Sequence, residues 1–284
     1  MPRHSKGIAL VSVLWLLVLL TTITVALTAT VRSEVRAVGN TVEMTKARYA
    51  AQAGVELGVI NLLVPQAQRW PADGSVRELA VRDISVRIAT VDEAGKIDIN
   101  HAAAEVLASL MTQSGVAMDR AGAIADAILD WRDVDDMRRL NGAEDFEYRM
   151  AGRNYGAADR GFHSVDELLQ VLGMDPEIFA AIEPALTVHS GLPGTNPQLA
   201  SPQVASVLAG LPAAQTNASG LSYTILVEAT TPQGIISRIA ATVAIVPGNA
   251  GKPYQVLAWR QLYRSPFDEP SNSAHYNIAM EGIL

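Results

Sequence analysis

The stretch Ile8–Val31 reads IALVSVLWLLVLLTTITVALTATV, and it decides how the rest of this 284-residue chain can be organised. It contains no charged side chain, and as a helix it would span ~36 Å, against a hydrocarbon thickness of ~30 Å. The stretch therefore predicts a membrane-spanning helix. Arg3, His4 and Lys6 precede it, and the positive-inside tendency keeps such a basic segment in the cytoplasm. We expect a single-pass protein of the bacterial inner membrane, with a cytoplasmic amino terminus and a periplasmic bulk.

A cleavable secretory signal is one alternative for this stretch. The apolar region of such signals is usually only ~7 to 15 residues long and ends in a small-x-small site. The run here is longer, and Ala26-Leu27-Thr28-Ala29 has the wrong spacing for that site. An ordinary, uncleaved signal anchor remains a second alternative on hydropathy alone.

Charge and composition argue against several function classes. The net charge of -7 repels phosphate backbones, and no basic run follows the apolar stretch, so nucleic acid is not an expected partner. The chain has no cysteine, which excludes disulfides, thiolate nucleophiles and cysteine-bound metals. Stability must then come from packing or from a metal bound by oxygen ligands.

The segments after the membrane stretch predict a mixed fold. Small and apolar residues recur every three or four positions up to Val64, so the helix should continue until Pro65 stops it. β-branched and aromatic runs predict strands, which are residues 83–91, 223–229, 235–246 and 254–259. Helical periodicity marks 102–131 and 164–186, and Ser164-Val165-Asp166-Glu167 forms a capping box. An antiparallel sheet should therefore be interrupted by a helical domain after its first strand.

The boundary of the apolar run resembles a prepilin peptidase site, because Lys6-Gly7 is followed by Ile8-Ala9-Leu10-Val11. This resemblance implies cleavage after Gly7 and methylation of Ile8 as the new amino terminus. The fifth mature position is Ser12, where most pilin-like chains carry glutamate. A buried carboxylate in a helical bundle is costly unless it is paired, and the resemblance implies that the amino group of a neighbouring subunit pairs with this glutamate. A subunit with no neighbour above it does not need the glutamate. Loss of the glutamate is typical of K-type minor pseudopilins.

Further landmarks of that family follow in order, and they are 92–100 (DEAGKIDIN), 129–131 (LDW), 142–145 (GAED), 165–168 (VDEL) and 254–260 (YQVLAWR). The chain thus resembles the general secretion pathway protein K family of the type II secretion system. The resemblance implies an α+β fold, in which a pilin-like long helix and small antiparallel sheet carry a large inserted α-helical domain of helix-hairpin-helix or SAM-like type. The expected parts are a leader at 1–7, a transmembrane and amphipathic helix at 8–64, a sheet domain at 65–97 and 219–262, the inserted domain at 98–218 and a tail at 263–284.

The same resemblance implies a role in assembly. A K-type subunit is expected to cap the tip of the periplasmic pseudopilus and to help initiate its assembly for export of folded proteins. The implied partners are the I-type and J-type minor pseudopilins, prepilin peptidase and inner-membrane lipid. A minor pilin of a type IV pilus and a plain single-span anchored periplasmic domain remain the alternatives.

Seven acids lie between Asp130 and Glu147, and their density suits calcium, which takes ~6 to 8 oxygen ligands. Asp133-Val134-Asp135 begins like an EF-hand, but Met137 occupies the next ligand position. K-type pseudopilins bind calcium in the helical domain, so the resemblance implies a structural calcium here. The expected ligands are Asp133, Asp135, Glu144 and Asp145, with Asp130 and Asp136 as further candidates. The alternative is a solvated loop neutralised by Arg132, Arg138 and Arg139.

The sequence argues against DNA binding and against catalysis. The hairpins around Ser114-Gly115-Val116-Ala117 and Leu172-Gly173-Met174-Asp175 lack the Gly-x-Gly turn with which helix-hairpin-helix motifs hold a DNA phosphate. No histidine pair has zinc-protease spacing, and no Gly-x-Ser-x-Gly elbow occurs. Paired carboxylates for glycan hydrolysis would need an aromatic-rich cleft, and aromatics make up only 5% of the chain. We expect no catalysis.

Overall fold

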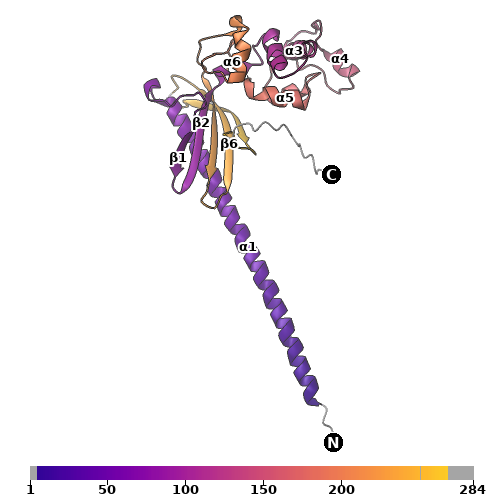
Figure 1. Ribbon diagram of the computed structural model, residues 1–284, viewed down its shortest axis with the longest axis vertical. Helices are drawn as coiled ribbons and strands as arrows, with labels where there is room; N and C mark the ends of the chain where they lie inside the picture. The colour runs from indigo at the N-terminus through magenta and orange to yellow at the C-terminus, as the bar shows by residue number, and fades with distance from the viewer. Residues whose placement is uncertain (1–4, 250, 268–284) are drawn as a thin grey trace.

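The computed structural model describes residues 5–249 and 251–267. One helix, α1 (Ser5–Leu63, 59 residues), runs from the membrane-spanning stretch into the folded body, as Figure 1 shows. Within it, Leu10–Thr28 is apolar and long enough to cross a membrane, and none of this segment is buried by the rest of the protein. The helix ends two residues before Pro65, whose ring cannot continue it, so the predicted stop is confirmed.

The end of α1 packs on a five-stranded antiparallel sheet of order β1-β2-β5-β6-β7. Its strands are β1 (Arg77–Val81), β2 (Ile84–Asp92), β5 (Ser222–Thr230), β6 (Ile236–Ile245) and β7 (Tyr254–Gln261). All four predicted strands are present. Strand β1 was not predicted, so the helical insertion follows the second strand of the sheet, and the expectation that it follows the first strand is wrong. A tight turn at Arg82, with φ of 59°, joins β1 to β2.

Small residues let α1 approach the sheet closely. Ala50, Ala51 and Gly54 of the helix are buried against alternate residues of β2, β5 and β6. A Cβ atom at Gly54 would lie only 2.6 Å from Val227 Cγ1, so this position needs glycine. The core of this part is completed by the apolar residues Val55, Val59, Leu62, Val86, Ile88, Ile225, Ile239 and Val243.

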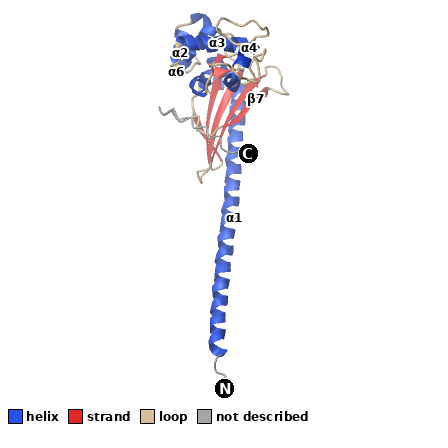
Figure 2. Cartoon of the chain, turned by 90° about the vertical axis from the view of Figure 1, so that its right-hand side faces the viewer, coloured by secondary structure: helices blue, strands red, loops and turns tan. Residues whose placement is uncertain are grey.

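The inserted domain occupies the chain between β2 and β5 and sits at the membrane-distal end of the sheet (Figures 1 and 2). Its helices are α2 (Ala104–Gln113), α3 (Met118–Arg132), α4 (Asp145–Met150), α5 (Pro176–Ile182) and α6 (Pro202–Ala209). Short 3-10 turns in this segment are η2 (Glu93–Gly95), η3 (Val165–Gln170), η4 (Glu183–Ala185) and η5 (Pro212–Ala214), and one more, η1 (Gln66–Gln68), lies between α1 and β1. The capping box at Ser164 is confirmed, since Glu167 Oε1 accepts the Ser164 N–H at 3.2 Å. Sequence periodicity missed α4 and α6.

A small parallel pair, β3 (Ile97–Asp98) and β4 (Leu186–Thr187), closes the base of the inserted domain. The second predicted helical range therefore ends in a strand, which corrects the expectation for Leu186. Buried Asp98 ties the pair to the next loop, because its carboxylate accepts from Ser190 Oγ at 2.9 Å and from the Gly191 N–H at 2.8 Å. Glu93, also buried, bonds Lys96 Nζ at 2.8 Å and the Thr187 hydroxyl.

The two hairpins that resemble helix-hairpin-helix motifs pack on each other. Arg120, near the start of α3, donates from Nη2 to Asp175 Oδ2 at 2.7 Å and to the Gly173 carbonyl at 3.2 Å. Asp175 also caps α5 through the Ile178 N–H at 2.8 Å. The turn that would face a phosphate is therefore filled by an internal ion pair.

Candidate functional site

The predicted processing site lies at the start of α1. Gly7 and Ile8 belong to the helix, which begins at Ser5, while Arg3 and His4 lie outside the described residues. Ser12 is on the exposed apolar part of the same helix, at the position where pilin-like chains carry glutamate. Cleavage after Gly7 and methylation of Ile8 stay predictions.

The acidic loop connects α3 to α4, and its first anchor is Asp130 on α3. The Asp130 side chain is fully buried, and the Arg139 N–H donates to its Oδ2 at 3.1 Å. Arg139 Nε lies 3.4 Å from Oδ1 of the same carboxylate. Gly142 packs on the same carboxylate, since a Cβ atom there would lie 2.0 Å from Asp130 Oδ2. The loop is thus folded back over a buried carboxylate.

Asp133 and Glu144 form the ends of this loop. Asp133 follows the last residue of α3, and Glu144 is the N-cap of α4. One oxygen of each, Asp133 Oδ1 and Glu144 Oε1, is buried and has no hydrogen-bond partner among the described residues. An uncompensated buried carboxylate is costly, so it takes up a proton or is matched by a cation.

The pKa values of these acids also reflect an excess of negative charge that is not neutralised. Burial, helped by the carboxylates of Asp130, Asp133, Asp159 and Asp136, raises the pKa of Glu144 to about 7. Burial and the charge of Asp135 also raise the pKa of Asp133. These groups interact as like charges around one place in the fold, which therefore favours a positive ion.

Asp159 is the one acid of this cluster that sequence reasoning missed. It lies 12 residues after the last of the seven acids, in a stretch that carried no landmark of the resembled family. Its backbone has φ of 53°, an uncommon conformation that aspartate tolerates better than most residues. Burial, together with Asp136 and Asp145, raises its pKa. Because Asp159 stands apart from the other acids in the sequence, no pattern of acidic residues marked it as a candidate ligand.

The other predicted ligands face outward. Asp135 and Asp136 are exposed, and Asp135 Oδ1 accepts the Met137 N–H at 2.9 Å. Asp145 is exposed and lies 3.4 Å from Arg149 Nη1. Among residues 5–249 and 251–267, no three acidic or histidine side chains already stand where they could hold one metal ion. A cation here would require the loop to close around it.

The arginines near the loop only partly neutralise it. Arg138 Nε lies 3.4 Å from Glu147 Oε1, and Arg139 pairs with Asp130. Arg132 instead donates to the backbone carbonyls of Ile99 and Ala102, so it anchors α3. The charge of Arg132 also acts on Asp133, where it opposes the rise in pKa, so neutralisation of the acids by arginines stays a prediction.

An aromatic cluster supports the loop from the core side. Trp131 lies 5.6 Å from Tyr148 and 6.2 Å from Phe162, measured between ring centroids. The Tyr148 hydroxyl accepts the Leu172 N–H at 3.1 Å, which ties α4 to the second hairpin. These rings hold α3 and α4 together, so the two ends of the acidic loop are fixed.

Comparison with known proteins identifies related families and a solved structure with a similar fold. A family model described as type II secretion system (T2SS), protein K matches residues 78–191, and a PilX N-terminal model matches residues 6–56. Type II secretion system protein K of Dickeya chrysanthemi is 24% identical over 265 residues, covering 71% of this chain and 73% of the relative. The Klebsiella pneumoniae protein of the same name is 26% identical over 207 residues, covering 65% and 63%.

A solved structure shares the fold. A chain from the GspK-GspI-GspJ complex of enterotoxigenic Escherichia coli matches with a TM-score of 0.60 at 15% identity, covering 79% of this chain and 99% of that one. The long helix, the antiparallel sheet and the inserted helices agree with the fold class expected from the sequence. The family model, the curated relatives and the solved structure together support type II secretion system protein K, a minor pseudopilin, as the family of this chain.

Proposed function

We propose that this minor pseudopilin caps the tip of the periplasmic pseudopilus and helps to initiate its assembly for export of folded proteins. The observation that carries the proposal is the placement of the inserted domain beyond the end of α1 and at the far end of the sheet from the membrane span (Figure 1). A subunit stacked above this one would meet that domain. Ser12, in place of the usual glutamate, agrees with a subunit that needs no neighbour above.

The chain is anchored by one apolar helix, and we propose that its amino terminus is cytoplasmic and its folded body periplasmic. It acts by assembly with I-type and J-type minor pseudopilins, after processing by prepilin peptidase, and it performs no catalysis. A type IV pilus minor pilin would share the amino-terminal helix but would lack the insertion between β2 and β5.

Native mass spectrometry tests the tip position. The full chain would be co-expressed with the I-type and J-type minor pseudopilins of the same organism and extracted from membranes. A tip subunit is expected once in each complex, however many other pseudopilins are present. Complexes with several copies of this chain would overturn the tip assignment, while leaving its membership of the pseudopilus intact.

We also propose that the acidic loop binds a structural calcium ion. The support is the pair of buried, unpartnered oxygens on Asp133 and Glu144, with Asp130 and Asp159 close enough to shift the pKa of Glu144. Carboxylate oxygens are the ligands that calcium prefers, and the ion would supply the missing positive charge. Asp135, Asp136 and Asp145 lie at the outer rim of the loop and would have to turn inward to bind.

Thermal unfolding of the detergent-solubilised full chain tests this site. We expect calcium to raise the melting temperature relative to a chelator, because an ion that binds only the folded state stabilises it by about 2.7 kcal/mol at a hundredfold excess over Kd. Magnesium is the control, since it tolerates irregular geometry poorly. Equal melting temperatures in calcium and in chelator would refute the proposal.

A further inference from the structure

The segment that follows β7 crosses the sheet. The Leu262 N–H donates to the Arg238 carbonyl of β6 at 3.1 Å. The centroid of the Phe267 ring then lies 4.7 Å from Cζ of Arg87 on β2. Strand β5 lies between β6 and β2, so the segment passes it as well. The next strand in the path of the chain is β1.

This crossing segment lies on the face of the sheet opposite α1. Arg87 alternates with Val86 and Ile88, which belong to the core beneath the helix, so its side chain points to the other face. The sequence continues through residues 268–284, which lie outside the described part of the structure. The first six of them, 268–273, can span up to about 20 Å, whereas neighbouring strands are about 4.8 Å apart. The residues after them can therefore reach the far edge of β1.

Strand β1 has a free edge. A two-residue turn joins Val81 to Ile84, so this pair exchanges backbone hydrogen bonds, as does every second pair beyond it. The N–H and C=O groups of Glu78 and Ala80 therefore point away from β2. Within the described part of the chain, no strand lies beyond β1. Such an edge readily pairs with another strand.

Apolar side chains beside this edge are incompletely covered. Leu79 of β1 packs on the core beneath α1 but is only partly buried. The pKa of Lys46 on α1 is raised by its hydrogen bond to Glu43 and, to a smaller extent, by the charge of Asp83 in the β1–β2 turn, so this side of α1 faces β1. Leu57 lies about three helical turns further along the same side and is 36% exposed. A strand added to β1 would cover this apolar surface.

The sequence after residue 273 has the pattern of such a strand. Tyr276, Ile278 and Met280 alternate with Asn277 and Ala279, which are polar or small. This alternation is typical of a strand with one buried face. The five residues also match the five-residue length of β1.

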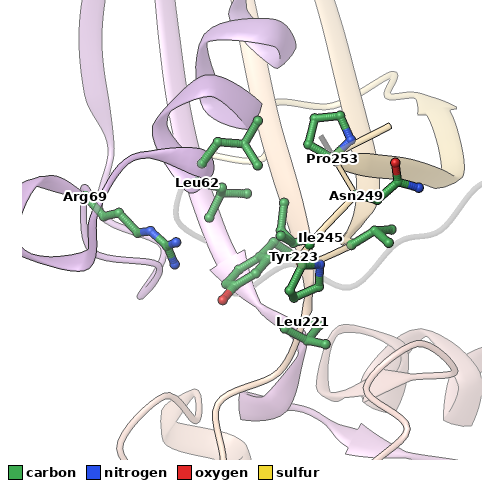
Figure 3. A pocket seen from close by; sticks show the side chains of 11 residues that line it. Leu62, Arg69, Leu221, Tyr223, Ile245, Asn249 and Pro253 are labelled. Atoms are coloured by element: carbon green, nitrogen blue, oxygen red, sulfur yellow. The ribbon is translucent and has the colours of Figure 1, made fainter. Parts of the chain in front are cut away.

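A hollow on the other face of the sheet is the competing site for these residues. It has a volume of about 450 Å³, and Figure 3 shows Leu62, Tyr223 and Ile245 in its lining. These three side chains belong to the core beneath α1 or pack on it. Phe267 lies on the opposite face, against the strand that pairs with β1. The free edge of β1 is therefore the site to which the crossing segment leads.

We propose that residues 276–280 of this chain form an antiparallel strand on the free edge of β1, with Tyr276, Ile278 and Met280 on the face towards α1. The antiparallel direction continues the pattern of the whole sheet. The added strand occupies backbone groups that would otherwise pair with another copy of the chain, so it protects the sheet from association through this edge. The inference is independent of the position of the chain in a pseudopilus.

Disulfide trapping tests this strand, because the chain has no cysteine of its own. When the centres of the two five-residue strands are opposed, Ile278 lies opposite Leu79. Asn277 then lies opposite Ala80 in a hydrogen-bonded pair, whose Cα atoms would be ~5.5 Å apart and within disulfide range. The detergent-solubilised full chain with Ala80→Cys and Asn277→Cys would be oxidised with copper phenanthroline.

The matched control combines Ala80→Cys with Ile278→Cys. A step of one residue moves a side chain to the other face of a sheet, so these two cysteines would point apart in the proposed strand. We expect at least fivefold more intrachain disulfide with Asn277→Cys than with Ile278→Cys. Labelling of the remaining thiols with a maleimide polymer measures this ratio on a gel.

Hydrogen exchange gives a second readout. A chain truncated after Phe267 lacks the proposed strand, so the amides of Glu78 and Ala80 should exchange at least about tenfold faster than in the full chain. The peptide of β7, residues 254–261, is the internal control and should exchange at the same rate in both proteins. Equal exchange of the β1 peptide in both proteins would contradict the proposal.

The remaining outcomes of the trapping experiment each overturn the proposal in a different way. Equal disulfide yields for Asn277→Cys and Ile278→Cys would show that the residues hold no fixed register on β1. A higher yield with Asn249→Cys, which lies in the lining of the hollow, than with Ala80→Cys would place them in that hollow instead. Disulfides between two chains would show that a second copy occupies the edge.

Discussion

Asp133 ends helix α3 and Glu144 opens helix α4, and each keeps one buried carboxylate oxygen without a hydrogen-bond partner among the described residues. The two helices are held by the ring contact of Trp131 with Tyr148, so the carboxylates cannot simply move into solvent. Like charges in a fixed place destabilise the fold until a cation or a proton neutralises them.

Glu144→Gln should therefore have opposite effects with and without calcium. In chelator it removes one buried like charge, and we expect the free energy of unfolding to rise by about 1 to 2 kcal/mol. In calcium it removes a ligand, so the calcium-dependent gain in melting temperature should shrink. Thermal unfolding of both proteins in both buffers measures this, and a variant with the same gain as the parent would exclude Glu144 as a ligand.

Gly142 should be intolerant of a side chain because it packs on Asp130. A Cβ atom at this position would lie 2.0 Å from Asp130 Oδ2, and we expect Gly142→Ala to cost about 1 to 3 kcal/mol of stability. Gly122→Ala is the matched control, since Gly122 lies inside α3 with no atom within 4 Å of its added Cβ. That change should stabilise by roughly 0.5 to 1 kcal/mol through helix propensity. Equal chemical-denaturation midpoints for the two variants would contradict this packing.

A paired carboxylate on the sheet should control acid stability. Glu228 accepts from Arg238 Nε at 2.6 Å and from Arg87 Nη1 at 3.0 Å. Burial alone would raise the pKa of Glu228, but the two arginines and a hydrogen bond with Ser265 together outweigh it and hold the pKa below its ordinary value. A lowered pKa in the folded state gives stability above the unfolded-state pKa of ~4.3, and this stability is lost as pH falls through the folded value.

Glu228→Gln should therefore make the free energy of unfolding depend less on pH in the acidic range. We expect a loss of about 1 to 3 kcal/mol near neutral pH, and a difference from the parent that narrows below about pH 4. Glu78→Gln on edge strand β1 is the control, because Glu78 is exposed. Melting temperatures between pH 2 and pH 7 measure the effect, and a constant difference across that range would rule out the pair.

Asp98 should stabilise the base of the inserted domain, where the β3–β4 pair meets the loop that follows β4. Its buried carboxylate accepts from Ser190 Oγ, the Gly191 N–H and the Asn100 N–H, so Asp98→Ala would leave these donors unsatisfied. We expect a loss of about 2 to 4 kcal/mol of stability, measured by thermal unfolding. Glu183→Gln breaks only an outer ion pair, 3.4 Å from Arg260, and should cost less than about 1 kcal/mol. An unchanged melting temperature for Asp98→Ala would contradict this role of the buried carboxylate.

Much of the fold could be predicted from the sequence because its signals are strong and local. The apolar run at 8–31, the alternation in β2 and the turns around Pro232 and Pro247 each depend on a few neighbouring residues. Strand β1 gave no signal, because its sequence RELAV is too short and too polar to alternate clearly. The two-residue pair β3 and β4 exists only through a contact 89 residues apart along the chain, which local patterns do not contain.

The acidic loop was found by composition, but its arrangement was not. Density of acids identified Asp133 and Glu144, while the burial of one oxygen on each depends on how α3 and α4 pack. Asp159 enters the cluster from a separate loop and could be found only from the fold. The outward position of Asp135 and Asp145 follows from their local partners, the Met137 N–H and Arg149.

The central claim is tested most directly by the mass and amino-terminal sequence of the mature chain. The chain would be extracted from the membranes of cells with and without prepilin peptidase. The account predicts a peptidase-dependent chain that starts at methylated Ile8, with residues 1–7 removed. An uncleaved chain, or one cut near Ala29, would contradict assembly as a pseudopilin and would indicate an ordinary anchored or secreted domain.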